Sequence, residues 1–349
     1  MTNTTHTAQN LPADVLLDLK DVKVGFQTRE GDVTAVNGVS YQVKRGEVLG
    51  IVGESGSGKS VTVRAVMRLL AKTAVEGPDG TIRFNPDGDK TYDLNGLKRD
   101  SKVMRSLRGD RIGMIFQEPM TALSPVHSIG SQITRTIMLH RKVNKAAARK
   151  RAAELLAKVQ LPHPELMLDR YPHQLSGGMR QRAMIALALA CDPALLIADE
   201  PTTALDVTTE AQILELLKSL QEELGMAIIF ITHNFGVVAD IADRVAVMYL
   251  GRIVETGEVD DIFYQPKHPY TQSLLQSIPR LGQKKVRRLK TIRGSVPDPY
   301  NVPEGCPFHT RCDYAQAGAC TQEVPTIKSF DNGQTALCHF AGDLKEGVE

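Results

Sequence analysis

The stretch "GESGSGKS", Gly53 to Ser60, decides the fold of this 349-residue chain. It fits the pattern G-x-x-x-x-G-K-[ST], in which glycines let backbone N–H groups turn toward phosphate oxygens. The continuous apolar run before it, Val48 to Val52, predicts a strand that is buried on both faces. The apolar residues between positions 63 and 70 recur at the spacing of one helix face. A glycine turn between such a strand and such a helix predicts a phosphate-binding loop.

The chemistry of this loop suits a nucleoside triphosphate with Mg²⁺. Lys59 supplies a cation for the β- and γ-phosphates, and Ser60 supplies a hydroxyl for Mg²⁺. The helix that follows points the positive end of its dipole at the same place. We expect the rest of the loop to contribute backbone contacts, from Gly53, Ser55, Gly56, Ser57, Gly58 and Val61.

A second motif, "LLIADE" from Leu195 to Glu200, predicts the other half of the site. It is a buried strand that ends in two acids. Asp199 can deliver a carboxylate to the Mg²⁺ shell, and Glu200 can hold and activate the attacking water. An apolar run ending in two acids is a weak signal alone, but it becomes strong beside a phosphate loop.

The remaining patterns predict an α/β fold. Alternating apolar residues over 17–26 and 41–44 indicate an antiparallel sheet at the entrance, and buried strands alternating with helices indicate a largely parallel sheet after it. We expect an inserted helical subdomain over about 122–190 and, where glycine, proline and cysteine content rises, a small irregular extension. The predicted domains are a disordered tail (1–14), a nucleotide-binding core (15–258) and the C-terminal extension (259–349).

Composition excludes several classes of protein. A net charge of +2 gives no electrostatic case for a nucleic-acid binder. The longest apolar run, Ala183 to Cys191, is about half of what a bilayer crossing needs. The N-terminus lacks the features of a secretory signal, so we expect the chain to stay inside and to meet a membrane only through a partner.

A second glycine turn lies in "HQLSGGMRQR", His173 to Arg182, where Ser176, Gly177 and Gly178 open a predicted helix. One nucleotide cannot occupy two distant turns of one chain. The economical solution is a head-to-tail pair of chains, in which the second turn of one caps the γ-phosphate held by the other.

With these motifs the sequence resembles the ABC ATPases over most of its length. The resemblance implies ATP as the nucleotide and makes Ser176 to Gly178 part of the family signature. It makes Gln117, in "IFQEP", the glutamine that touches Mg²⁺ or water near the docking site of a membrane partner. His233, in "ITH", becomes the histidine that contacts the γ-phosphate, so the implied catalytic set is Glu200, His233 and Gln117.

The resemblance assigns three further positions. Asp206, in "TALD", matches the D-loop. Phe26 lies where the family stacks an aromatic ring on adenine, although a plain strand-core aromatic is nearly as good an interpretation. Asn234 departs from the family, which usually has aspartate after the histidine, and this leaves open how His233 is held.

Two segments resemble one branch, the oligopeptide/dipeptide importer ATPases: "KHPYTQSLLQSIP" from Lys267 and the later "GSVPDP". This branch implies a second ABC ATPase subunit, a paralogue in a heterodimer, together with two transmembrane permease subunits and an extracytoplasmic peptide-binding protein. It implies a peripheral position on the cytoplasmic side of the cell membrane. Importers of nickel or glutathione are the first alternative, and a soluble ABC ATPase acting on nucleic acid is a weaker one.

Four cysteines near the C-terminus, Cys306, Cys312, Cys320 and Cys338, follow the pattern C-x5-C-x7-C-x17-C. Structural zinc favours tight C-x2-4-C pairs, which this pattern lacks, and four thiolates suit an iron–sulfur cluster at least as well. Spacing alone does not fix the metal. The resemblance implies a [4Fe–4S] cluster, with zinc as the alternative and His309 and His339 as reserve ligands.

Overall fold

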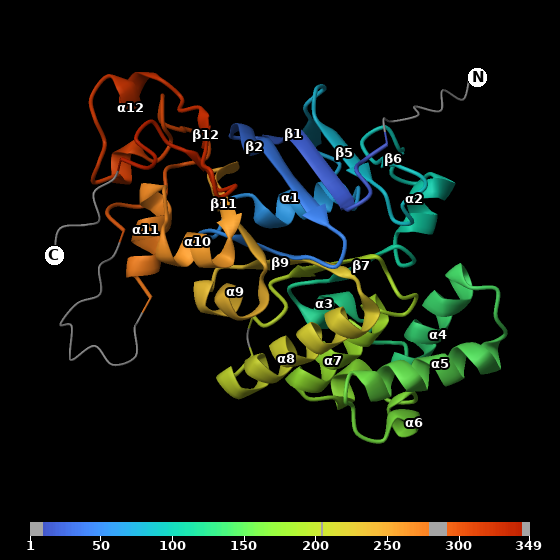
Figure 1. Cartoon of the computed structure of the whole chain (residues 1–349). Helices are drawn as coiled ribbons and strands as arrows, with labels where there is room; N and C mark the ends of the chain where they lie inside the picture. Colours follow the sequence, from blue (N-terminus) through green and yellow to red (C-terminus); the bar gives the residue numbers. More distant parts are fainter. Residues whose placement is uncertain (1–9, 204, 279–291, 344–349) are drawn as a thin grey trace, which may run out of the picture.

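The structure, a computed structural model, describes residues 10–203, 205–278 and 292–343. Its described strands form two sheets (Figure 1). The antiparallel sheet has the order β2-β1-β5-β6, with β4 also on β1. The larger sheet has the order β12-β13-β11-β10-β3-β9-β8-β7.

The antiparallel sheet contains the alternating segments of the sequence. Strand β2 alternates buried and exposed side chains from Val39 to Lys44, whereas β1 is buried at every residue from Val15 to Leu19 and exposes Lys20 and Lys23 after that. The period-2 prediction is confirmed over 41–44, but it is wrong for the start of β1, which is buried on both faces. The strands are β1 (Val15–Thr28), β2 (Gly31–Lys44), β4 (Ala74–Glu76), β5 (Thr81–Phe84) and β6 (Tyr92–Asp93).

The centre of the larger sheet is parallel. Neighbouring pairs β10·β3, β3·β9, β9·β8 and β8·β7 all run in the same direction, so their carboxyl ends meet at one edge. The three central strands are buried along their whole length, as predicted from their continuous apolar runs. The parallel strands are β3 (Val48–Val52), β7 (Ile112–Ile115), β8 (Leu195–Asp199), β9 (Ala227–Thr232) and β10 (Arg244–Tyr249).

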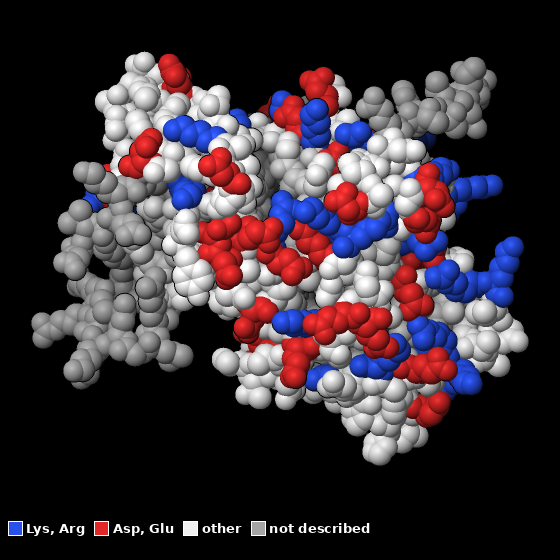
Figure 2. All heavy atoms as spheres, in the orientation of Figure 1, with Lys and Arg blue, Asp and Glu red and all other residues white. Residues whose placement is uncertain are grey.

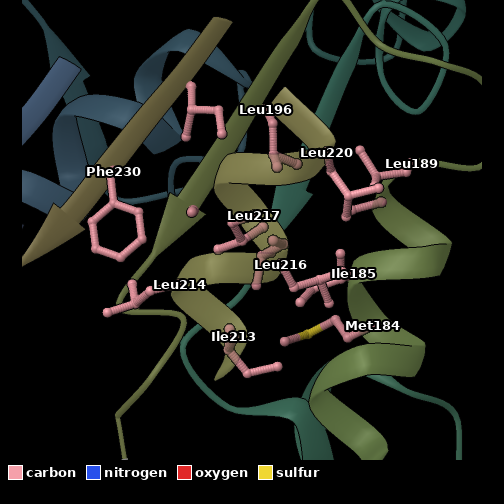
Figure 3. Close-up of a cluster of buried hydrophobic side chains, with 14 of the residues drawn as sticks. Met184, Ile185, Leu189, Leu196, Ile213, Leu214, Leu216, Leu217, Leu220 and Phe230 are labelled. Carbon is pink, nitrogen blue, oxygen red and sulfur yellow. The ribbon is translucent and has the colours of Figure 1, made fainter. Parts of the chain in front are cut away.

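Helices cover this sheet. The predicted stripe on α8 is buried against α7 and the sheet, and Figure 3 shows Leu216 and Leu220 lying toward Ile185 and Leu189. Gly225 ends α8 in the left-handed conformation, with φ of 63°. Helices outside the predicted helical subdomain and before residue 259 are α1 (Lys59–Val66), α2 (Lys102–Leu107), α8 (Val207–Leu224) and α9 (Phe235–Ile241).

The described elements between residues 119 and 188, where we expected a helical subdomain, are helices. They pack their apolar faces on one another and on the large sheet, in the same hydrophobic core as α8. They are α3 (Pro119–Ala122), α4 (Ile129–His140), α5 (Lys145–Lys158), α6 (Pro164–Met167), the 3₁₀ turn η1 (Pro172–Gln174) and α7 (Gly177–Ala188).

The N-terminal end of the fold differs from the expected tail of residues 1–14. Residues 1–9 lie outside the described residues. Leu11, however, is buried, and its N–H donates a hydrogen bond to the Thr91 hydroxyl at 3.3 Å. The carbonyl of Asp14 accepts from the N–H of Arg45. The segment from Leu11 to Asp14 therefore belongs to the folded core, because it carries an apolar anchor and backbone bonds.

The C-terminal extension is more closely joined to the core than the sequence indicated. Its strand β13 pairs antiparallel with β11 and so extends the large sheet, with β12 outside it (Figure 1). Since β11 would otherwise be a bare edge, this pairing satisfies its outer hydrogen-bonding groups. The strand that β13 pairs with is β11 (Arg252–Glu258), and the elements of the extension are α10 (Val259–Tyr264), α11 (Pro269–Gln276), η2 (His309–Arg311), α12 (Ala319–Gln322), β12 (Ile327–Ser329) and β13 (Thr335–Leu337).

A buried carboxyl, Glu255 of β11, joins three parts of this region. Its oxygens accept the N–H groups of Lys267 and His268 and the side-chain amide of Gln334. Burial raises the pKa of Glu255 to about 7, although these hydrogen bonds favour the ionised form. The folded protein therefore holds a proton at Glu255 at pH values where the unfolded chain has already lost it.

This buried proton predicts a pH effect on stability. As pH rises from 4.5 to about 7, the wild type should lose stability relative to Glu255→Gln, since only the wild type must ionise a buried group. The free energy of unfolding of the wild type, relative to the variant, should fall by about 2–3 kcal/mol over this pH range. Above it, the difference should stay constant. Thermal unfolding of both proteins measures it, with Glu258→Gln as an exposed control on the same strand. A difference that does not change with pH would contradict the prediction.

Candidate nucleotide site

The predicted phosphate-binding loop connects the carboxyl end of β3 to the start of α1. Two of its glycines are required by space as well as by conformation. A Cβ on Gly53 would lie 2.1 Å from the Met248 carbonyl oxygen, and one on Gly58 would lie 2.3 Å from the Ala35 carbonyl oxygen. Both also have positive φ, of 155° and 98°. Only glycine fits these two positions, so the conformation of the loop requires both of them.

Lys59 lies across its own loop. Its ammonium donates to the carbonyl oxygens of Gly53 and Glu54 at 2.8 and 2.9 Å. Burial lowers the pKa of Lys59, and the carboxylates of Glu200, Asp199 and Glu54 oppose this effect. The helix that begins at Lys59 has no side-chain cap. Its first N–H groups and the ammonium together are a set of donors that fits an anion.

Ser60 and Asp199 meet at the predicted metal position. The Ser60 hydroxyl donates to Asp199 Oδ1 at 2.7 Å, whereas the buried Oδ2 has no hydrogen-bond partner among the described residues. Burial raises the pKa of Asp199, and the bond from Ser60 opposes this. A hydroxyl beside an unsatisfied carboxylate oxygen is a donor set that fits Mg²⁺.

The three predicted catalytic residues come together around Glu200. Gln117, Glu200 and His233 follow β7, β8 and β9, so the parallel sheet brings them to one edge. The Gln117 amide donates to Glu200 Oε2 at 3.0 Å, and His233 Nδ1 lies 3.5 Å from Oε1. The family resemblance also placed Gln117 at Mg²⁺. In the structure its side chain contacts Glu200, and the Mg²⁺ contact stays a prediction.

The backbone and one neighbour hold the Glu200 carboxylate in place. Its φ of 48° is uncommon for a residue with a side chain, and such strain often marks a functional position. The hydroxyl of Thr203 donates to Oε2 at 2.9 Å. The sequence analysis did not single out Thr203. The one feature that could have indicated it is a hydroxyl side chain three residues after Glu200. Asn234 caps α9 by accepting the N–H of Gly236, so it holds the segment after His233.

The second glycine turn and the predicted D-loop form a separate group. Ser176 caps α7 by accepting the N–H of Met179, and Asp206 caps α8 by accepting the N–H and hydroxyl of Thr209. A Cβ on Gly178 would lie 2.9 Å from the Thr209 methyl, so the two caps are close neighbours. In the described residues no hydrogen bond joins Ser176 or Asp206 to the phosphate loop or to Glu200.

The remaining predicted contacts lie on the loop and beside it. Ser55 and Gly56 are exposed at the tip of the loop, whereas Ser57 is buried. Val61 and Phe26 are both half-buried and pack against the core of the antiparallel sheet. This packing agrees with the strand-core interpretation of Phe26, and stacking on adenine stays a prediction.

The four C-terminal cysteines converge. Cys306, Cys312, Cys320 and Cys338 line one small cavity, together with His309 and His339, and all are free thiols. Burial raises the pKa of Cys306 to about 11 and that of Cys312 to about 12. Across residues 10–203, 205–278 and 292–343, however, no group of three or more His, Cys, Asp or Glu side chains is positioned to hold a metal ion.

Comparison with known proteins identifies the class of this fold and site. Residues 36–203 match the ABC transporter family. The fold is similar to that of a dimeric ATP-binding cassette solved in a post-hydrolysis state with ADP and Pi, with a TM-score of 0.61, 30% identity, and 70% of this chain and 99% of that chain covered. The chain belongs to the ABC transporter family, as one of its ATP-binding cassettes, which confirms the resemblance and the predicted fold.

The branch is defined by the extension. Residues 254–320 match the C-terminal region of oligopeptide/dipeptide transporters, and the chain belongs to that branch. A putative peptide import ATP-binding protein of Brucella melitensis is 49% identical over 93% of this chain and 96% of its own length. The oligopeptide transport ATP-binding protein OppD of Bacillus subtilis is 51% identical over 90% of this chain and 86% of its own length.

Two surface properties bear on partners. In the described part of the chain, none of the helices has both the length and the apolar character needed to span a bilayer. On the face drawn in Figure 2, basic side chains alternate with acidic ones over the described residues. That face therefore resembles a mixed protein surface more than a nucleic-acid binding stripe.

Proposed function

We propose that this chain hydrolyses ATP to power an importer of oligopeptides or dipeptides. The observation that carries the proposal is the meeting of Gln117, Glu200 and His233 beside the phosphate loop, in a chain with the extension of the oligopeptide/dipeptide branch. The names of the similar proteins from Brucella and Bacillus support peptides as the cargo.

The geometry gives each residue a role in the reaction. Lys59 and the first N–H groups of α1 bind the phosphates. Ser60 and Asp199 would hold Mg²⁺, which would neutralise part of the phosphate charge when bound. Glu200 orients the attacking water and accepts its proton. Gln117 and His233, which contact the Glu200 carboxylate, respond to the presence of the γ-phosphate.

We propose that two cassettes work head to tail. Ser176 to Gly178 and Asp206 form neighbouring caps that make no hydrogen bond to the phosphate loop among the described residues, and they would close the site of a partner. The dimeric state of the similar solved cassettes supports this arrangement. The partner cassette is a paralogue, and the pair drives two permease subunits fed by an extracytoplasmic peptide-binding protein. The chain itself lies peripherally on the cytoplasmic side of the membrane.

Uptake by living cells tests the cargo. The gene for this chain is deleted from its own cells, and uptake of labelled dipeptides, pentapeptides, nickel and glutathione is measured. A wild-type copy should restore peptide uptake, and a Lys59→Ala copy should not. Unchanged peptide uptake together with lost nickel or glutathione uptake would contradict the peptide assignment.

We propose in addition that Cys306, Cys312, Cys320 and Cys338 hold a [4Fe–4S] cluster. Their shared cavity and free thiols support this, and the positive iron ions would keep these buried groups deprotonated. Since the described thiols do not yet form a metal-binding group, the cluster would have to draw them together. When bound, it would supply a cross-link between the Cys306–Cys320 segment and the end of β13.

Metal analysis of protein purified without oxygen tests the cluster. We expect about four irons and four sulfides per chain, lost when the four cysteines are replaced by serine. Cys191→Ala is the matched control, because Cys191 is buried in the main core and should leave the iron content unchanged. Stoichiometric zinc, or no metal, would contradict the prediction.

A further inference from the structure

Glu54, the second residue of the phosphate-binding loop, is held by the C-terminal extension. The guanidinium of Arg311 binds both oxygens of its carboxylate, with Nη1 2.7 Å from Oε2 and Nη2 3.0 Å from Oε1. The two residues are 257 positions apart in the sequence. The Arg311 side chain is only 4% exposed and that of Glu54 27%. Such a two-point contact fixes orientation as well as charge.

Arg311 is itself locked in place. Its Nε donates to the carbonyl of Arg293 at 3.1 Å, and its guanidinium carbon lies 5.8 Å from the centre of the Tyr249 ring. Phe308, three residues earlier, is buried against Tyr249 and Tyr270. The position of the guanidinium therefore depends on how the extension packs on the core.

The extension also holds the backbone of the loop. The hydroxyl of Tyr270, a fully buried residue of α11, accepts the N–H of Glu54 at 3.0 Å. The carbonyl oxygen of Glu54 accepts a hydrogen bond from the ammonium of Lys59 at 2.9 Å. Glu54 thus connects the extension directly to the lysine that faces the phosphates.

We propose that Arg311 and Tyr270 are positioning residues for the ATP site, which hold the Glu54 carboxylate away from the triphosphate. The inference rests on the proposed function of the loop. A free carboxylate here would repel the polyanionic ligand and compete for the Lys59 ammonium. The extension therefore sets the affinity of the loop for ATP, in addition to whatever partner it contacts.

Nucleotide titration of the full chain tests this. Arg311→Ala should raise the Kd and KM for MgATP about tenfold, which is an ordinary size for coupling between two sites. The kcat at saturating ATP should change less than about twofold. In the double variant Glu54→Gln/Arg311→Ala the repelling charge is gone, so the Kd should return to within about threefold of the wild-type value. A role of Arg311 in packing alone would not be rescued by a change at Glu54.

Matched variants keep the test sharp. Arg293→Ala removes an exposed arginine of the same extension, which pairs with Asp313, and should bind ATP as the wild type does. Arg311→Lys keeps the positive charge without the two-point contact, so it should show a smaller loss of affinity than Arg311→Ala and serves if that variant fails to fold. Tyr270→Phe should weaken ATP binding about threefold by leaving the Glu54 N–H without its acceptor.

The outcomes separate this inference from the proposed function. If Lys59→Ala abolishes ATP binding but Arg311→Ala binds as tightly as the wild type, the positioning role is wrong and the ATP site stands. The same holds if the Arg311→Ala defect persists in the double variant. If Lys59→Ala leaves ATP binding unchanged, the loop is not the nucleotide site and both proposals are wrong.

Discussion

Replacing Glu200 with glutamine is expected to leave ATP bound but to slow its hydrolysis by about 100-fold or more. Glutamine can keep the contacts that the carboxylate makes with Gln117 and Thr203, so the site should hold its shape. It cannot accept a proton from the attacking water. The loss should therefore appear in the rate of cleavage and leave the affinity nearly unchanged.

Two measurements on the same preparation separate these effects. Titration with a fluorescent ATP analogue gives the affinity, and single-turnover cleavage of labelled ATP gives the chemical rate. Glu222→Gln, on the exposed face of α8, is the matched control and should behave as the wild type. Cleavage by Glu200→Gln at the wild-type rate would remove Glu200 from its role.

Replacing Lys59 with alanine is expected to weaken MgATP binding by about 100-fold, whereas Glu200→Gln should leave the affinity nearly unchanged. The ammonium is the cation that lies directly over the loop, and it is held there by the carbonyls of Gly53 and Glu54. Without it the triphosphate would face the carboxylates of Asp199 and Glu200 with less compensating charge. Removing a charge-assisted phosphate contact in a partly buried site costs several kcal/mol.

The same titration measures this loss. Lys72→Ala removes an exposed lysine shortly after α1 and should leave the affinity unchanged. The melting temperature of Lys59→Ala should stay close to that of the wild type, because the lysine serves the ligand more than the fold. Wild-type affinity in Lys59→Ala would contradict the assignment of the loop.

Much of the core and of the catalytic group could be predicted from the sequence, because the signals are local and the sheet is parallel. Continuous apolar runs placed β3, β8 and β9, and each of the polar residues that follow them had to lie at the carboxyl edge. The contact of Gln117 and His233 with Glu200 is the direct result. Those residues were singled out by the family resemblance, and the structure supplies their geometry.

The extension could not be predicted in the same way. Strand β13 has only three residues, Thr335 to Leu337, and its pairing with β11 depends on an edge formed about 80 residues earlier. The contact of Arg311 with Glu54 joins distant parts of the chain and leaves no periodic signal. The contacts predicted for Ser176 and Asp206 need a second chain, and those predicted for the four cysteines need a metal.

The most direct test of the central claim is Mg²⁺-dependent release of inorganic phosphate from ATP by the purified full chain. The account predicts release that saturates with ATP, requires Mg²⁺, and disappears in both Lys59→Ala and Glu200→Gln. Phosphate release that continues at the wild-type rate in both variants would show that the edge formed by β3, β7, β8 and β9 is not the site of hydrolysis.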